Sequence, residues 1–202
     1  MNQIYVLHTG ELAPYREAAL AALSDERRKK VLSCHTEQDA LRSLGAGLLL
    51  RHFVGAGPFS YGEFGKPCLP GSPPFSLSHG GALAVLAVGE PGTELGVDVE
   101  ACQRDWKASV ARRLFTAEEQ EWLSGSGERF FHLWTRKEAV LKCRGSGLSR
   151  IKVFSVLEDR CCLDDAFFAL RSFICADHCI SLAVSGGSAE ASICMINVQI
   201  LL

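Results

Sequence analysis

LAVGEPGTELGVDVE, at residues 86–100, predicts a strand, a turn and a second strand that ends in the motif GVDVE. Successive side chains of a strand point to opposite faces, so Asp98 and Glu100 project from one face, about 6.6 Å apart. Two carboxylates this close repel each other unless a cation or a shared proton lies between them. Oxygen ligands favour Mg²⁺ or Mn²⁺ over zinc, although alternating acids can equally mark a solvated strand face.

WTRKEAVLK, at residues 134–142, belongs to a predicted amphipathic helix. A helical wheel places Glu138 between Trp134 and Phe131, inside an otherwise apolar stripe. An unpaired buried carboxylate is costly, so a cation or Lys142, one turn further along, has to compensate for its charge. Taken alone, a Glu–Lys pair one turn apart is commonly a surface ion pair that contributes little to stability.

Helices and strands are mixed along the whole chain, which predicts the fold class α+β. We expect strands at 4–8, 75–88, 151–157, 167–174, 179–185 and 191–202, the second of them interrupted at 78–81. Helices are expected at 14–23, 25–33 and 39–54, from Thr116 to the SGSG sequence at 124–127, and around Glu138 as far as Gly145 or Gly147. Thr36 with Asp39, and Thr116 with Glu119, have the spacing of a capping box.

A polar segment at 101–113 separates two halves of similar size, 1–102 and 103–202, each with its own strands and helices. We therefore predict two α+β halves, although the sequence contains no residue-level repeat that would prove a duplication. The stretch 58–74 is rich in Gly and Pro and is expected to form an irregular loop that carries Lys66.

Composition argues against several classes of protein. A net charge of −2 does not favour bulk nucleic-acid binding. The sequence has no charged-then-apolar signal at its start and no apolar run near the roughly 20 residues that cross a bilayer, so we expect a cytoplasmic protein without membrane contact. Its nine cysteines are irregularly spaced, which favours buried thiols over disulfides. Cys175, His178 and Cys179 form a ligand-like cluster, but it lacks the second half of a zinc site.

Further residues suit an anion. A basic cluster, Arg27–Lys30, lies near the first turn of the helix at 25–33, where acids would be favoured, so a solvated face and an anion site are both open. Ser78 and His79 are neighbours on a strand and point to opposite faces. They therefore cannot share a proton as a hydrolase dyad, and contacts to an anion suit them better.

Six motifs occur in order along nearly the whole chain: SDERRKK, EFGKPCLP, FSLSHGG, GVDVE, FTAEE and FHLWTRKEAVLKCRGSGLS. In this set the chain resembles the 4'-phosphopantetheinyl transferases of the surfactin-synthetase-activating type. The resemblance implies transfer of the phosphopantetheine arm of coenzyme A to a serine of an apo acyl or peptidyl carrier protein, with release of adenosine 3',5'-bisphosphate. It also implies two similar halves related by a pseudo-twofold axis, with the coenzyme in the cleft between them, and a complete site in a monomer.

The resemblance also implies roles for individual residues. Asp98, Glu100 and Glu138 would hold Mg²⁺, or Mn²⁺, at the pyrophosphate, and Glu138 would take the proton of the carrier serine. Lys142 would steady the attacked phosphate. Contacts to the coenzyme are implied for six positions, the first three of them around its 3'-phosphate: Arg27, Lys30, Ser43, Lys66, Ser78 and His79. Position 27 is lysine in one member of this family, so arginine keeps the charge for the phosphate but differs from lysine in its contact geometry. The carrier contact is implied for Gly145–Cys175, without an indication of which carrier is used.

Two alternatives stay open from the sequence. The chain could be a coenzyme A binding module that has lost catalysis, although every expected charged position is present. It could also be a Mg²⁺-dependent phosphohydrolase that uses the same three acids. That alternative leaves Lys66, Ser78 and His79 without a purpose.

Overall fold

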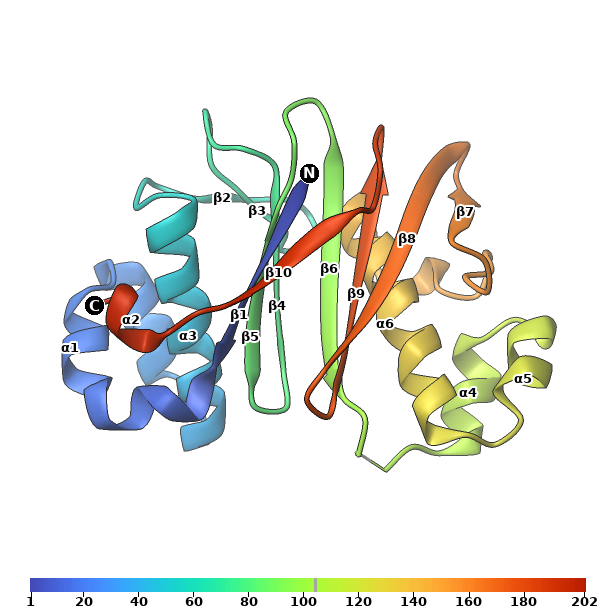
Figure 1. Ribbon diagram of the computed structural model, residues 1–202, viewed down its shortest axis with the longest axis horizontal. Helices are drawn as coiled ribbons and strands as arrows, with labels where there is room; N and C mark the ends of the chain where they lie inside the picture. Colours follow the sequence, from blue (N-terminus) through green and yellow to red (C-terminus); the bar gives the residue numbers. More distant parts are fainter. Residues whose placement is uncertain (104) are drawn as a thin grey trace.

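Two four-stranded sheets lie side by side in the computed structural model, which describes residues 1–103 and 105–202 (Figure 1). The first sheet has the order β10-β1-β5-β4, with β10 (Ala191–Met195) parallel to β1 (Asn2–His8), and β5 (Leu83–Val88) antiparallel to β1 and to β4 (Phe75–Gly80). The second has the antiparallel order β6-β9-β8-β7, formed by Glu94–Ala101, His178–Ser185, Ala166–Cys175 and Arg160–Leu163. These strands confirm the mixed α+β fold class.

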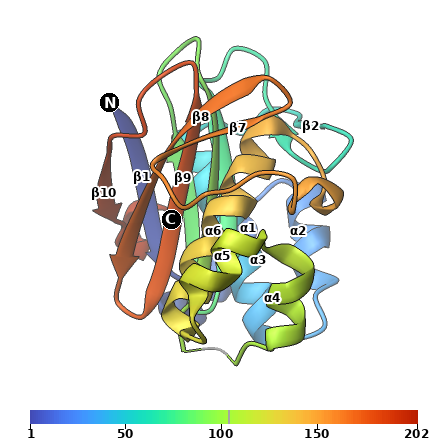
Figure 2. The same cartoon turned by 90° about the vertical axis from the view of Figure 1, so that its right-hand side faces the viewer.

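Helices pack against the sheets, and in the side view α2 to α6 lie to one side of β1, β9 and β10 (Figure 2). The α-helices are α1 (Arg16–Ala21), α2 (Asp25–Leu32), α3 (Glu37–Phe53), α4 (Ala108–Leu114), α5 (Ala117–Leu123) and α6 (Gly127–Arg144). Short 3₁₀ segments cover Thr9–Tyr15, Leu148–Arg150 and Val198–Ile200, and a small hairpin pairs β2 (Ser60–Tyr61) with β3 (Pro67–Cys68). Among the described residues, no helix is both long and apolar enough to cross a membrane.

Local capping signals place several helix ends where the sequence predicts them. Thr36 accepts the Asp39 N–H at the start of α3. Thr116 and Glu119 form a complete capping box at the start of α5, because each side chain bonds the backbone of the other residue. Helix α6 ends at Gly145, whose φ of 69° is the left-handed conformation that glycine adopts at little cost.

Other expected elements differ from the structure. The stretch 75–88 is not one interrupted strand but the hairpin β4–β5, which turns at Gly81, where φ is +54°. The helix expected from 14 begins at Arg16 after a 3₁₀ segment that contains Pro14. The loop at 58–74 contains the β2–β3 hairpin, and the polar segment at 101–113 contains the start of α4, while Arg104 lies outside the described residues.

Residues 151–157 are not a strand, because a buried lysine takes the carbonyl groups of this segment. The ammonium of Lys137 on α6 donates to Ile151 O at 2.7 Å and to Phe154 O at 2.5 Å. It also pairs with Glu119 at 2.9 Å, and neither side chain of this pair is exposed. Burial lowers the pKa of Lys137, and the Glu119 carboxylate opposes that shift. This ion pair fixes α6 to α5 and to the segment that follows α6.

Strand pairing crosses residue 102 in two places. Strand β6 pairs with β9 in the second sheet, and β10 returns to pair with β1 in the first. The side chains of Ile196, Val198 and Leu201 then pack in the core of the first sheet. A division of the chain into 1–102 and 103–202, and a pseudo-twofold relation between its halves, stay predictions.

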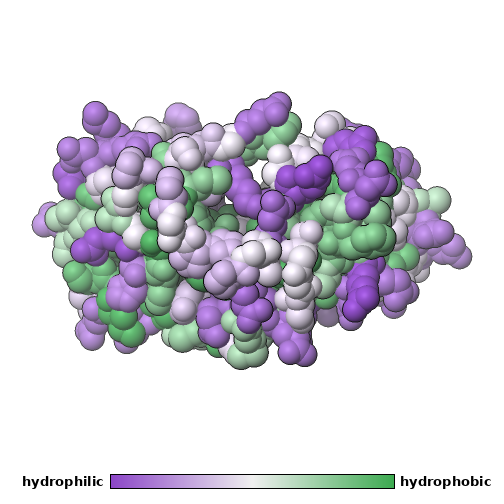
Figure 3. Space-filling view, turned by 90° about the horizontal axis from the view of Figure 1, so that it is seen from above, coloured by the Kyte–Doolittle hydropathy of each residue, from purple (hydrophilic) through white to green (hydrophobic). Residues whose placement is uncertain are grey.

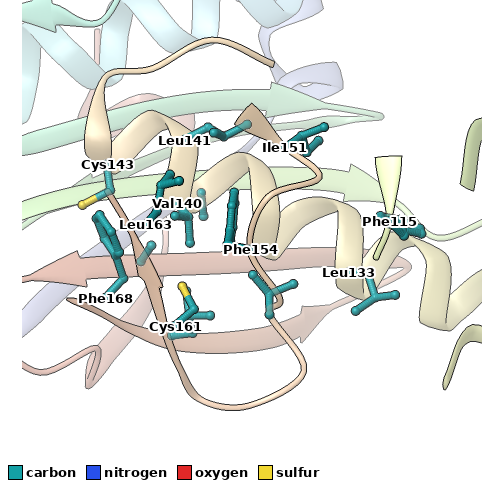
Figure 4. Close-up of a cluster of buried hydrophobic side chains, with 14 of the residues drawn as sticks. Phe115, Leu133, Val140, Leu141, Cys143, Ile151, Phe154, Cys161, Leu163 and Phe168 are labelled. Atoms are coloured by element: carbon teal, nitrogen blue, oxygen red, sulfur yellow. The ribbon is translucent and has the colours of Figure 1, made fainter. Parts of the chain in front are cut away.

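Three groups of buried apolar side chains form the core. One lies between α3 and the first sheet, and a second lies between α6 and the second sheet, where Phe115, Val140, Phe154 and Phe168 are buried (Figure 4). The third joins residues of both sheets, among them Ile4, Val97 and Ile180. Because this third group is shared by β5 and β6, it holds the two sheets together at the strand that contains the motif GVDVE.

Candidate functional site

Two glycines allow the backbones around the motif GVDVE to approach closely. A Cβ atom on Gly96 would lie 2.1 Å from Ala139 O and 2.3 Å from Cys143 N, so β6 packs directly against the backbone of α6. A Cβ atom on Gly80 would lie 2.2 Å from Val99 O, so β4 packs directly against β6. Any side chain at either position would force these elements apart. The glycines therefore bring residues of β4, β6 and α6 to one place.

Asp98 is the centre of this place. It is buried on β6, and its Oδ1 atom accepts the ammonium of Lys142 at 2.6 Å and the hydroxyl of Ser78 at 2.9 Å. The Lys142 ammonium also donates to Ser78 Oγ, at 2.9 Å. The second oxygen, Oδ2, is buried without a hydrogen-bond partner. A buried carboxylate oxygen without a donor indicates room for a further positive charge or donor.

Glu138 lies one turn before Lys142 on α6 and shares its surroundings with the acids of β6. Burial, together with the charges of Asp98 and Glu100, raises the pKa of Glu138 to about 7, while the charge of Lys142 opposes this rise. The charges of Asp98 and Glu100 therefore act on Glu138, while a metal site formed by the three acids stays a prediction. A carboxyl group with a pKa near neutrality can accept or release a proton under ordinary conditions.

These acids line a pocket of about 330 Å³ together with basic residues from the first half of the chain. From above, the surface is hollowed between the two sides of the molecule, and hydrophilic residues border the hollow (Figure 3). The pocket is lined by Arg27, Lys30, Leu50, Tyr61, Gly65, Pro67, Leu77, Ser78, His79, Asp98, Glu100, Trp134, Glu138 and Lys142. A larger pocket, of about 790 Å³, lies beside Trp122 and His132, but none of the predicted site residues lines it.

Arg27 and Ser43 have unsatisfied polar atoms beside this pocket. One Arg27 nitrogen, Nη2, donates to Ser43 O at 3.2 Å, whereas Arg27 Nε and Ser43 Oγ are buried without partners. Lys30 lines the pocket one helical turn after Arg27. Buried donors without an acceptor suit an anion, which would satisfy them and neutralise the two cations.

His79 and Lys66 have different surroundings. His79 lines the pocket and is exposed. Partial desolvation lowers the pKa of His79, and the positive charges of Arg42 and Lys142 lower it further. Lys66 is not among the lining residues, and its ammonium donates to Leu95 O at 3.2 Å and Cys143 O at 3.0 Å. In this arrangement Lys66 ties its loop to β6 and to the end of α6.

A divalent cation fits the chemistry of the three acids in part. Asp98, Glu100 and Glu138 line one pocket, and the free Oδ2 atom of Asp98 is a suitable ligand. Within residues 1–103 and 105–202, however, no three His, Cys, Asp or Glu side chains are grouped closely enough to hold a metal. Lys142 takes the other oxygen of Asp98 in this arrangement. Cys175, His178 and Cys179 do not form such a group either.

Sequence reasoning missed several residues of the site. Leu50 on α3 and Tyr61 on β2 line the pocket, but nothing in their local patterns distinguishes them from ordinary core or loop residues. Gly80 and Gly96 did carry a signal, because each glycine interrupts a strand beside a functional motif. An isolated glycine in a strand often marks the close approach of another backbone, which is its role at both positions.

Comparison with known proteins identifies relatives. Residues 94–192 match the family model described as the 4'-phosphopantetheinyl transferase superfamily. The 4'-phosphopantetheinyl transferase Sfp of Bacillus subtilis is 30% identical over 148 residues, which are 66% of this chain and 65% of the relative. The 4'-phosphopantetheinyl transferase AcpT of Salmonella typhi is 38% identical over 99 residues, which are 45% of this chain and 51% of the relative. A phosphopantetheinyl transferase of Thraustochytrium is 28% identical over 93% of this chain and 80% of its own length. The chain thus spans slightly less than two thirds of the Bacillus relative.

Proposed function

We propose, because the chain belongs to the 4'-phosphopantetheinyl transferase superfamily, that it transfers the phosphopantetheine arm of coenzyme A to a serine of an apo acyl or peptidyl carrier protein. Adenosine 3',5'-bisphosphate would be the second product. One observation supports this proposal above others: the acids of β6 and α6, Lys142, and the two basic residues Arg27 and Lys30 line a single pocket. A molecule with one phosphate at one end and a diphosphate further along matches that order of charges.

Coenzyme binding is proposed for the basic side of the pocket. The 3'-phosphate would accept hydrogen bonds from Arg27, Lys30 and the Ser43 hydroxyl. It would thereby supply an acceptor for Arg27 Nε and for Ser43 Oγ, which are buried without partners. Ser78 and His79, which lie on strand β4 and line the same pocket, would also contact the coenzyme. Lys66 is proposed to act by holding its loop against β6 and α6, since its ammonium is bound to carbonyl groups there.

The reaction is a phosphoryl transfer to an oxygen. The carrier serine oxygen forms a bond to the phosphorus that bears the pantetheine arm, and the bond from this phosphorus to the bridging oxygen of the pyrophosphate breaks. Glu138 would take the serine proton, a role that its pKa of about 7 supports because the group is then partly ionised at neutral pH. Lys142 is placed to stabilise negative charge on the phosphate. Mg²⁺ or Mn²⁺ held by Asp98, Glu100 and Glu138 would polarise the pyrophosphate oxygens.

The carrier is proposed to dock on Gly145–Cys175. Four large apolar side chains of this segment are well exposed: Leu148, Val153, Phe167 and Ile174. Large apolar side chains that are exposed in the free protein are available for contact with another protein. A monomeric state and a cytoplasmic location remain predictions from the sequence.

The test is incubation with coenzyme A, Mg²⁺ and a panel of apo carrier proteins, followed by intact-protein mass spectrometry. We expect one carrier at least to gain the mass of the phosphopantetheine arm. Glu138→Gln and Asp98→Asn should each abolish the gain, because they remove the proposed base and the proposed metal ligand. Glu94→Gln, on the exposed start of the same strand β6, is the matched control and should keep it.

Two outcomes would replace the proposal. Binding of coenzyme A without transfer to any carrier would identify a binding module, and release of phosphate without a protein acceptor would identify a phosphohydrolase. Full activity in both Glu138→Gln and Asp98→Asn would refute the roles of these residues.

A further inference from the structure

Strands β4 and β6 lie next to each other, but they belong to different sheets and no backbone ladder joins them in the described part of the chain. Side chains join them instead. The Ser76 hydroxyl accepts the Val97 N–H at 3.0 Å. Two residues further along β4 and one residue further along β6, the Ser78 hydroxyl donates to Asp98. Beyond it, Gly80 packs on Val99 O. We call this line of contacts the β4–β6 seam.

The seam ends at the turn of the β4–β5 hairpin, where side chains from other elements take up the backbone polar groups. Arg42 on α3 donates to Gly81 O at 2.9 Å. Thr9 donates to Ala82 O through its N–H at 2.8 Å and through its hydroxyl at 3.1 Å. The Ala82 N–H donates to Nε2 of His178 at 3.1 Å. His178 is the first residue of β9, so this last bond links the first sheet to the second.

The His178 ring is built into this position. Only 3% of the residue is exposed, and a Cβ atom on Gly81 would lie 2.2 Å from Nε2, so the ring packs against the bare face of that glycine. Because Nε2 accepts a hydrogen bond, the ring proton of the neutral form must be on Nδ1. Nδ1 lies 2.7 Å from Oδ1 of Asp177. Burial lowers the pKa of His178, which favours the neutral ring.

We propose that His178 is a positioning residue: by accepting the Ala82 N–H, it closes the end of the β4–β6 seam and fixes Ser78 and His79 against the acids of β6. Ala82 is three residues after His79 and four after Ser78, so a movement of the turn is transmitted directly to the strand that carries them. His178 itself does not line the pocket. The inference rests on the proposed function, because it assigns Ser78 and His79 to the coenzyme.

The test compares two substitutions that differ in one property. His178→Gln keeps a side-chain acceptor that can receive the Ala82 N–H, whereas His178→Leu has similar bulk and no acceptor. His35→Gln, at an exposed position, is the control for loss of an imidazole. Three quantities are measured for each protein: hydrogen exchange of the Ala82 amide, KM for coenzyme A and kcat for carrier loading.

In His178→Leu we expect the Ala82 amide to exchange about tenfold faster and KM for coenzyme A to rise about tenfold, the effect of one hydrogen bond, with kcat within about twofold of the original. His178→Gln should restore most of both values, which a role in packing alone would not produce. Equal behaviour of the two variants, or a His178→Leu protein that loses kcat with an unchanged KM, would overturn the proposal. An unprotected Ala82 amide in the unsubstituted protein would also overturn it. Failure of the proposed function can be distinguished from failure of this inference. If the proposed function is wrong, the unsubstituted protein does not load any carrier, but the exchange data still test the role of His178.

Discussion

Substitution of Gly96 by alanine tests whether the contact between β6 and α6 sets the geometry of the site. The added Cβ atom would lie 2.1 Å from Ala139 O and 2.3 Å from Cys143 N, both of them backbone atoms that no rotamer change can move. Ordinary contacts between carbon and oxygen begin near about 3.3 Å, so α6 has to retreat by about 1 Å. Glu138 and Lys142 are carried by this part of α6, whereas Asp98 stays on β6.

The cost of this movement has two parts. Overpacking of a close contact destabilises a fold by about 1–3 kcal/mol, and a misplacement of about 1 Å in a reacting site can reduce the rate about a hundredfold. We therefore expect Gly96→Ala to remain folded at room temperature, with a lower urea midpoint, and to load carriers about a hundredfold more slowly. The rate is measured from the initial formation of holo carrier by mass spectrometry, with far-UV circular dichroism as the test of folding.

The matched control is Gly10→Ala. Gly10 is exposed, and its added Cβ would lie 3.3 Å from the side chain of His8, which can move away. This variant should load carriers at the original rate. If Gly96→Ala also loads carriers at that rate while folded, the approach of β6 to α6 does not control the site, and the argument from Gly96 is wrong.

Three further predictions concern charge. Lys137→Met should lower the free energy of unfolding by about 3–5 kcal/mol in urea titrations, because it leaves the Glu119 carboxylate buried without its cation, and the added substitution Glu119→Gln should restore part of the loss. Without metal, the urea midpoint should fall as pH rises from about 4.5 to about 7, because over that range Glu138 keeps its proton in the folded state and has lost it in the unfolded state. The urea midpoint of Glu138→Gln should not show this dependence on pH, and added Mg²⁺ should weaken it in the unsubstituted protein. Arg27→Ala should raise KM for coenzyme A about tenfold or more and leave KM for dephospho-coenzyme A unchanged, and equal effects on both would show that Arg27 does not bind the 3'-phosphate.

Features that depend on neighbouring residues were predictable from the sequence. The capping box of Thr116 and Glu119 and the end of α6 at Gly145 are local events, so short motifs define them. The need of Glu138 for a compensating cation was also predictable, because a carboxylate in an apolar stripe is costly without a partner. Its grouping with the acids of β6 was implied by the resemblance and not by this local pattern.

Features that depend on distant contacts were not predictable in this way. The apolar alternation of residues 151–157 is that of a strand, yet Lys137 takes the carbonyl groups of Ile151 and Phe154, which a ladder would need. The pairing of β10 with β1 joins the two ends of the chain, and no local pattern specifies it. The contacts of Lys66 were not predictable either, because its ammonium donates to Leu95 O and Cys143 O, two groups far from it in sequence.

The position of the site at the β4–β6 seam has a physical reason. A backbone ladder between β4 and β6 would satisfy the hydrogen-bonding groups of both strands without side chains. The seam is instead held by side chains, and two of them, Ser78 and Asp98, also belong to the site. Lys142 contacts Ser78 on one strand and Asp98 on the other, so its charge both joins the strands and offsets the repulsion among the acids. A phosphate that attracts the Lys142 ammonium would compete with Asp98 for it, and a cation at Asp98 would release it. Binding of the anion and of the cation should therefore favour each other, because each removes the partner that the other has to displace.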